Sequence, residues 1–437
     1  MCGAGVSARR SVVGNTNRPG RIVADRSKDW TATDLSRVAL HPVSQMKIAV
    51  AHNTYQQPGG EDIVFAQECE LLKRYGHTVI TYTRSNHDIK DSSLADRLTL
   101  VKKTIWGSDT RREFADLIRL QRPDLVHVHN TFMSISPSIY SACQEANIPV
   151  VQTLHNYRLF CSAATLFRNG QVCEECVDHS LWRGVRYGCY RNSRAATATV
   201  ALMLATHRTM GTWVRNVDCY IALTEFARQK SIASGLPGSK IFVKPNFIAS
   251  DPGPSTEVRR YALLVGRLSP EKGIKTLVSA WQRLQNPVPL QIIGDGPMRA
   301  GLEAEVESRF PSVRFRGQLP REQTLKAMKG ARFLIFPSVW YEGFPMIIAE
   351  AFACGVPVIC SHLGSMREIV DDRRTGLHFQ AGDDEDLAAK VEWAWAHPEQ
   401  MAEMGRAARR EYETHYTAER NYSLLMDIYH GAVAAHG

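Results

Sequence analysis

The segment FLIFPSVWYEGFPMIIAEAF, residues 333–352, joins a strand to a helix and carries two glutamates. The apolar run at 333–336 predicts a buried strand, and residues 346–354 predict a helix. Glu342 is therefore expected in the loop, and Glu350 roughly a turn and a half inside the helix. A strand, a polar loop and a helix in this order form the repeating unit of an α/β domain.

The spacing of the two glutamates limits what they can bind. Carboxylates that share a metal ion from one helix stand about three or four residues apart, whereas Glu342 and Glu350 stand eight apart. This spacing across a loop-to-helix junction suits two separate contacts on one extended ligand. The free N–H groups at the helix start can also bind hydroxyls or an anion. A capping acid plus a solvated helix glutamate is the alternative.

Short apolar runs alternate with helical segments on both sides of this unit. The first set lies at 47–52, 78–83, 125–129, 150–154, 219–223 and 241–244. The second set lies at 261–265, 290–294, 313–315, 333–336, 357–360 and 376–379. Each set predicts a doubly wound, Rossmann-like α/β domain. Because ligands bind beyond the C-terminal ends of such strands, we expect the two domains to face each other across a cleft.

Composition divides the chain further. Residues 1–45 are rich in Arg, Ser, Thr and Gly without an apolar period, which predicts a disordered or spurious extension. We place one domain at 46–246 and a second at 257–418, joined by the Pro-, Gly- and Ser-rich stretch 247–256. A last helix at 419–437 is expected to pack back across the domain junction.

The charge balance favours small anionic ligands over nucleic acid. The 437 residues carry a formal charge of +9, a mild surplus that suits a phosphate-bearing ligand or an anionic membrane surface. Nucleic-acid binding would need a basic face interleaved with aromatic residues, and a pI near 9.0 alone does not provide one. Ten cysteines without a signal peptide predict reduced thiols in the cytoplasm.

Peripheral membrane contact is a further hypothesis, at the inner face of the cytoplasmic membrane. No apolar run reaches the roughly 18 residues that span a bilayer. A basic and aromatic stretch nevertheless precedes the apolar segment that starts at Ala195, which suits an interface. Its residues are Trp182, Arg183, Arg186, Tyr187, Arg191 and Arg194. A buried helix with a solvated basic loop is the alternative.

A second polar cluster, GRLSPEKG, follows the strand at 261–265. Ser269 can cap a helix that Pro270 begins, which places Lys272 in its first turn close to Arg267. Cations at a helix start oppose the helix dipole. Two of them there make sense if a diphosphate joins them.

Glycines mark two more strand ends. Gly59 and Gly60 follow the first strand in QQPGGED, where a backbone without side chains can approach a ligand at a helix start. Gly294 opens GDGP after the strand at 290–294. Each is a weak signal by itself, since a simple tight turn needs the same residues.

These motifs, in this order, resemble the family 4 retaining glycosyltransferases of GT-B fold, from Met46 to about residue 430. The resemblance implies that Glu350 binds the ribose hydroxyls of a nucleotide-sugar and that Glu342 lies by the transferred sugar. It implies that Arg267 and Lys272 bind the donor diphosphate, so that catalysis needs no metal or other cofactor. Charge that develops on the leaving phosphate would be stabilised by these two cations.

The same resemblance assigns further donor contacts. Gly59, Gly60 and Gly294 would line the donor site, and backbone N–H groups after Glu342 would meet sugar hydroxyls. These groups belong to Gly343, Phe344 and Met346. Pro345 replaces the commoner glycine of the family and removes one donor. His155 in LHN matches a histidine that contacts the donor sugar, and His129 in HVHN ends a neighbouring strand.

The implied reaction is transfer of a hexosyl group to a glycan or lipid-linked saccharide, with retention, in surface polysaccharide biosynthesis. A sugar epimerase of the same fold is one alternative. A basic, zinc-containing nucleic-acid-binding protein is another, and it would leave both β/α sets unexplained. A dehydrogenase is disfavoured because no G-x-G-x-x-G follows a strand with an acid about 20 residues later.

Four cysteines fall within 29 residues of one another between the fourth and fifth strands. They are Cys161, Cys173, Cys176 and Cys189. The middle pair is a C-x2-C knuckle, as in structural zinc sites, although such sites usually have two knuckles. Free thiols and disulfides remain alternatives to zinc, and His179 is a spare ligand.

Overall fold

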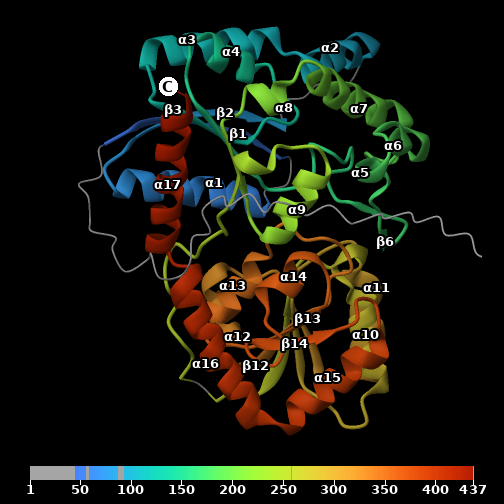
Figure 1. Cartoon of the computed structure of the whole chain (residues 1–437). Coiled ribbons are helices and arrows are strands. Elements are labelled where there is room, and N and C mark those ends of the chain that lie inside the picture. Colours follow the sequence, from blue (N-terminus) through green and yellow to red (C-terminus); the bar gives the residue numbers. More distant parts are fainter. Residues whose placement is uncertain (1–44, 56–58, 87–92, 257, 437) are drawn as a thin grey trace, which may run out of the picture. The chain divides into compact units, whose positions relative to one another are not determined.

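The computed structural model describes residues 45–55, 59–86, 93–256 and 258–436. Residues from Gln45 onward form one compact unit that contains two six-stranded parallel sheets, each with helices around it (Figure 1). The predicted N-terminal extension lies outside the described residues. Among the described helices, none combines the length and the hydropathy that crossing a membrane requires.

The first sheet has the order β2-β1-β3-β4-β7-β8, and all of its strand pairs are parallel. Its strands are β1 (Lys47–Thr54), β2 (Thr78–Ser85), β3 (Leu125–Asn130), β4 (Val150–Leu154), β7 (Cys219–Ala222) and β8 (Ile241–Val243). Every residue of β3, β4 and β7 is buried, as central parallel strands require. We call the part of the chain that carries this sheet the first half.

The second sheet repeats the architecture in the order β11-β10-β9-β12-β13-β14. Its strands are β9 (Tyr261–Val265), β10 (Leu290–Ile293), β11 (Val313–Gly317), β12 (Ala331–Phe336), β13 (Val358–Ser361) and β14 (Gly376–Phe379). We call this part the second half. Each predicted apolar run is a strand of one of the two sheets, which confirms the predicted pair of doubly wound α/β sheets.

Helices connect the parallel strands. In the first half they are α1 (Gly60–Arg74), α2 (Leu94–Ile105), α3 (Ser108–Gln121), α4 (Ile139–Glu145), α7 (Arg194–Thr209), α8 (Thr212–Arg215) and α9 (Glu225–Ala233). In the second half they are α10 (Ile274–Arg283), α11 (Arg299–Arg309), α12 (Arg321–Lys329), α13 (Met346–Ala353), α14 (Gly364–Ile369) and α15 (Asp384–Ala396). Between β4 and α7 lies an insertion with β5 (Phe167–Arg168), β6 (Gln171–Val172), α5 (Glu175–Asp178) and α6 (Trp182–Tyr187).

The last two helices are α16 (Pro398–His415) and α17 (Ala418–His436). α16 packs on α13 and on β12 of the second half, whereas α17 contacts α1, β4 and β7 of the first (Figure 1, red). The apolar face of α17 includes Leu425, Tyr429 and Ala432, which are fully buried with β1 residues such as Ile48. The segment after the second sheet thus completes the core of the first.

Candidate active site

The loop after β12 brings Glu342 against Lys272. The Lys272 Nζ donates to Glu342 Oε1 at 2.7 Å, and Ser338 Oγ donates to the same oxygen at 2.7 Å. Glu342 is buried, with 7% of its surface exposed. Lys272 also stands over the rings of Phe336 and Trp340, at 5.6 and 5.4 Å from their centres. The structure therefore joins two residues that the sequence singled out separately.

The turn that carries Lys272 differs from the prediction. Pro270–Lys272 forms a single 3-10 turn, η4, and α10 begins only after Gly273. Ser269 makes no capping bond, because its hydroxyl bonds the carboxylate of Glu271. Gly273 has φ +69°, and an added Cβ would lie 1.8 Å from the carbonyl oxygen of Pro337. Only glycine lets this turn lie directly against the start of the Glu342 loop.

Glu350 occupies a separate environment in α13. Its carboxylate lies 3.1 Å from the guanidinium of Arg321, and only 14% of its side chain is exposed. Burial raises the pKa of Glu350, and the charge of Arg321 opposes that rise. Glu342 and Glu350 thus each lie beside a different cation, Lys272 for Glu342 and Arg321 for Glu350. Sequence reasoning missed Arg321, although a cation at the first residue of a helix is the same signal that marked Lys272.

Arg267 and Gly294 lie at the ends of neighbouring strands. The Arg267 side chain is exposed, and among the described residues no ion pair or side-chain hydrogen bond holds it. Gly294 has φ +139°, and a Cβ there would lie 1.9 Å from the carbonyl oxygen of Gly266. Gly294 therefore has a packing role, since it lets the loops after β9 and β10 touch beside Arg267.

α13 begins at Met346, as predicted. Pro345 is the N-cap of the helix, so its missing N–H lies just before the first turn. Phe344 and Met346 are half-buried against the apolar core of the second half. A Cβ on Gly343 would lie 2.5 Å from the carbonyl oxygen of His155, which is a first-half residue. Gly343 thus permits a backbone contact between the Glu342 loop and the segment after β4.

The glycines after β1 lie at the start of α1. Gly59 is the N-cap and donates its N–H to Asp62 Oδ2 at 2.6 Å, which occupies that donor within the protein. Gly60 is the first helical residue, and an added Cβ there would meet no atom within 4 Å. Packing in the described structure therefore does not require a glycine at position 60.

The two histidines are paired with each other. His129 Nδ1 lies 2.9 Å from His155 Nε2, and His129 Nε2 lies 3.1 Å from Glu68 Oε1. His129 is only 3% exposed, and its ring is satisfied inside the core. Burial, and then the neighbouring His127, lower the pKa of His129 to about 4. Burial and His129 lower the pKa of the half-buried His155, which keeps both rings neutral at pH 7.

Glu68 forms a buried ion pair beneath these histidines. Its Oε2 accepts from Lys244 Nζ at 2.9 Å, and the side chains of Glu68 and Lys244 are 2% and 1% exposed. Lys244 also donates to Asn421 of α17 at 3.1 Å. Glu68, His127 and His129 are close enough to share a metal ion. Because Lys244 already balances the carboxylate charge, we interpret the group as a structural ion pair.

Two protein-family models match this chain. The family model described as Glycosyltransferase Family 4 matches residues 58–251, and the model described as Glycosyl transferases group 1 matches residues 249–411. The two matches overlap at residues 249–251 and together contain every strand of both sheets except β1. The chain belongs to the family 4 type of GT-B glycosyltransferases.

Curated relatives of this glycosyltransferase include a glycogen synthase of Mycobacterium tuberculosis. It is 26% identical over 322 residues, which is 71% of this chain and 69% of the relative. The D-rhamnosyltransferase WbpZ of Pseudomonas aeruginosa is 31% identical over 162 residues, 36% of this chain and 42% of the relative. Among solved structures, Anabaena HepE matches with a TM-score of 0.62 at 17% identity, covering 87% of this chain and 99% of HepE. That last likeness shows the fold.

Glu61 is a polar group of the glycosyltransferase that sequence reasoning missed. Its two carboxylate oxygens accept from the side-chain amides of Asn130 at 3.2 Å and Asn156 at 3.1 Å. Burial raises the pKa of Glu61 to about 7, and hydrogen bonds from Tyr55 and Asn156 only partly offset it. Asn156 follows His155, so Glu61 belongs to the same strand-end region. The sequence feature that could have identified Glu61 is its place directly after the two glycines in QQPGGED.

The raised pKa of Glu61 predicts that thermal stability depends on pH in a way that can be measured. A carboxyl group whose pKa is higher in the folded state stabilises the fold while protonated, and this contribution is lost as pH rises from its unfolded pKa through its folded pKa. We expect the wild type to lose thermal stability relative to Glu61→Gln between about pH 5 and pH 8. Melting temperatures at both pH values measure this. Glu70→Gln, an exposed position of α1, should show no such trend.

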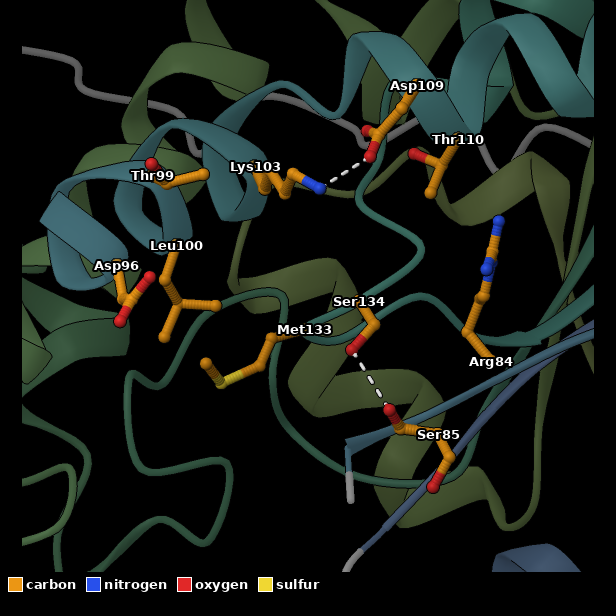
Figure 2. Close-up of a pocket in the computed structure, with 10 residues that line it drawn as sticks. All are labelled: Arg84, Ser85, Asp96, Thr99, Leu100, Lys103, Asp109, Thr110, Met133 and Ser134. Carbon is orange, nitrogen blue, oxygen red and sulfur yellow. Dashed lines mark hydrogen bonds and ion pairs between the residues drawn. The ribbon is translucent and has the colours of Figure 1, made fainter. Parts of the chain in front are cut away.

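A pocket of about 310 Å³ lies at the end of β2 in the first half (Figure 2). Figure 2 shows Leu100 and Met133 at its apolar side, the ion pair of Lys103 and Asp109 at its rim, and Arg84 pointing inward. The other lining residues are Ser85, Asp96, Thr99, Thr110 and Ser134. No sequence pattern marks this pocket, because its lining residues come from several separate segments.

Proposed function

We propose that this glycosyltransferase is a retaining hexosyltransferase that uses a nucleotide-sugar donor. The observation that carries the proposal is the contact of Lys272 with buried Glu342 at the strand ends of the second half, with exposed Arg267 on the preceding loop. A solved structure of HepE contains UDP and another contains UDP-glucose, which supports a nucleotide-sugar donor here. The same strand-end location is where doubly wound sheets bind ligands.

In the proposed reaction the two cations act on the leaving group. As the bond between the sugar C1 and the diphosphate breaks, negative charge develops on the phosphate, and Arg267 and Lys272 stabilise it. The acceptor oxygen forms its bond to C1 on the same face, and the departing phosphate oxygen takes the acceptor proton. The lysine and arginine supply positive charge, so the proposed reaction needs no divalent metal.

The remaining donor contacts follow the E-x7-E segment. Glu350 accepts hydrogen bonds from ribose hydroxyls, and the charge of Arg321 opposes the rise in the Glu350 pKa that burial causes. Peptide N–H groups of Gly343, Phe344 and Met346 meet the sugar hydroxyls, with Glu342 beside the transferred sugar. The loop of Gly59 and Gly60, Gly294 and the half-buried His155 complete the proposed donor surroundings.

For the acceptor we propose a saccharide or a lipid-linked saccharide, bound by the first half and used in surface polysaccharide assembly. The pocket of Figure 2 offers polar side chains next to Leu100 and Met133, a mixture that suits a sugar. Trp182 and Tyr187 are 52% and 41% exposed on α6, and the nearby arginines are exposed as well. This surface supports peripheral contact with an anionic membrane, which co-sedimentation with anionic liposomes at low salt would test.

A donor screen tests the function. Purified protein is mixed with UDP-, GDP- and ADP-sugars and a panel of saccharide acceptors, and nucleotide release is measured with and without EDTA. We expect one donor class to be used, activity to persist in EDTA, and NMR of the product to show the anomeric configuration of the donor. An inverted linkage would contradict retention. Conversion of the donor sugar without transfer would instead support the epimerase alternative.

The two glutamates should affect different kinetic constants. Glu350→Gln keeps the shape of the side chain but weakens acceptance from ribose hydroxyls, so we expect a raised donor KM with a smaller change in kcat. Glu342→Gln should mainly lower kcat, because the charge beside the transferred sugar and Lys272 is lost. Steady-state kinetics with varied donor separate the two effects. If neither kcat nor the donor KM changes in either variant, Glu342 and Glu350 have only a structural role.

A further inference from the structure

The insertion between β4 and α7 gathers four cysteines around one glycine. Cys176 lies in α5, and its sulfur would be 3.5 Å from a Cβ on Gly184. The peptide N–H of Gly184 donates to the Leu181 carbonyl at 3.1 Å, and the Gly184 carbonyl accepts from Cys189 N–H at 3.1 Å. Ser162 Oγ would lie 3.4 Å from the same added Cβ on Gly184. Cys161, the residue before Ser162, therefore lies in the same region of the insertion.

Cys173 joins the group through the β5–β6 hairpin. Its N–H donates to the Leu166 carbonyl at 2.8 Å, which fixes the chain just after β6 and just before the knuckle turn. Cys173 and Cys176 are the two residues of the C-x2-C knuckle, and Cys161, the most enclosed of the four, is 7% exposed.

We propose that Cys161, Cys173, Cys176 and Cys189 bind one structural zinc ion. A hairpin followed by C-x2-C is a common frame for zinc, and four thiolates that repel one another are stabilised by a divalent cation. His179 is exposed, whereas the four cysteines are buried or half-buried, so we do not include it among the ligands.

Zinc binding would contract the insertion. Among the described residues, no three of these sulfurs lie mutually within 4.8 Å. Zn–S bonds of about 2.3 Å would draw them around one centre. Cys176 lies in the four-residue α5, Cys173 directly follows the two-residue β6, and Cys189 follows the short α6. Such short elements have little core of their own and would gain order from the metal.

The knuckle also contacts the Glu342 loop. Glu174, between Cys173 and Cys176, accepts from Tyr341 Oη at 2.8 Å and from Lys230 Nζ at 2.7 Å. Tyr341 directly precedes Glu342, whose carbonyl accepts from Tyr157 at 3.3 Å. The zinc site thus acts through Glu174 as a positioning device for the Glu342 loop, and this second step rests on the proposed function.

Metal analysis of the full chain tests the site directly. Protein purified in reductant without added metal should contain about one zinc per chain, and a thiol-specific mercurial should release it with about four equivalents. Cobalt substitution should give the absorption of a tetrahedral thiolate site. His179→Ala should keep the zinc, and Cys173→Ser/Cys176→Ser should lose it. Zinc near zero in freshly reduced wild type, or zinc retained in the double variant, would overturn the proposal.

The positioning step has its own test. Glu174→Gln and Tyr341→Phe should retain zinc and lower kcat/KM roughly tenfold, because the Glu342 loop loses its support. Glu175→Gln removes a neighbouring carboxylate that pairs with Arg168 and should leave kcat/KM near the wild-type value. Wild-type kinetics in both Glu174→Gln and Tyr341→Phe would overturn the positioning role while leaving the zinc site intact. An inactive wild type that contains zinc would overturn the proposed function alone.

Discussion

Replacing Arg267 or Lys272 with alanine should lower kcat by about 10² or more, by analogy with the loss of one donor that stabilises developing charge. The Arg267 side chain has no ion pair or hydrogen bond within the described structure, so its removal should leave the fold unchanged. Lys272 has a further role, since its removal leaves the buried Glu342 carboxylate with Ser338 as its side-chain partner. We therefore expect a small loss of thermal stability in Lys272→Ala alone.

Lys275→Ala is the matched control for both variants. Lys275 is an exposed lysine on α10, within three residues of Lys272, and has the same charge. Its removal changes the net charge near the site without touching the Glu342 loop. Initial rates at saturating donor measure kcat for the three variants. Wild-type turnover in Arg267→Ala or Lys272→Ala would contradict the proposed role in diphosphate binding.

Lys244→Met should destabilise the protein by about 3–5 kcal/mol, the cost of leaving a buried charge without its partner. Methionine fills a volume similar to that of lysine. The loss of stability therefore measures the cost of leaving the charge of Glu68 unpaired, since the Glu68 side chain is only 2% exposed. Burial by itself would raise the pKa of Glu68, but Lys244, His127 and His129 hold it well below its usual range. The unfolding midpoint in urea measures the loss.

Two comparisons distinguish charge from shape at this position. Glu68→Gln/Lys244→Met removes both charges and should recover much of the lost stability. A Glu68 pKa below its unfolded value stabilises the fold above that unfolded value, and this contribution is lost as pH falls. In Lys244→Met the carboxyl can protonate more easily, so the difference from wild type should shrink on acidification. Equal instability of the single and double variants would contradict the ion-pair interpretation.

The strands could be predicted from the sequence because central parallel strands are continuous apolar runs. β3, β4 and β12 stand out by composition alone, and their order along the chain follows from the alternation with helices. The two-residue strands β5 and β6 were missed, since two residues carry no periodicity.

The candidate site was predictable only in part. Glu342, Glu350 and Lys272 occur in short motifs, so sequence alone marked them. Arg321 and Glu174 matter through partners far away in the sequence, at Glu350 and Tyr341, and no local pattern reveals such pairs. His129 also ends a strand, but its ring bonds Glu68 inside the core, so a strand-end position alone does not mark a functional histidine.

The position of α17 has a consequence for biosynthesis. A ribosome completes the first sheet long before it reaches residues 418–436, yet these residues cover buried apolar positions such as Ile48 and Leu125. Until they emerge, the nascent first half exposes that surface to solvent and to other chains. Closure of the first core therefore waits until α17 has been synthesised. A chain stopped after α16 would keep every strand and still be a target for chaperones and proteases.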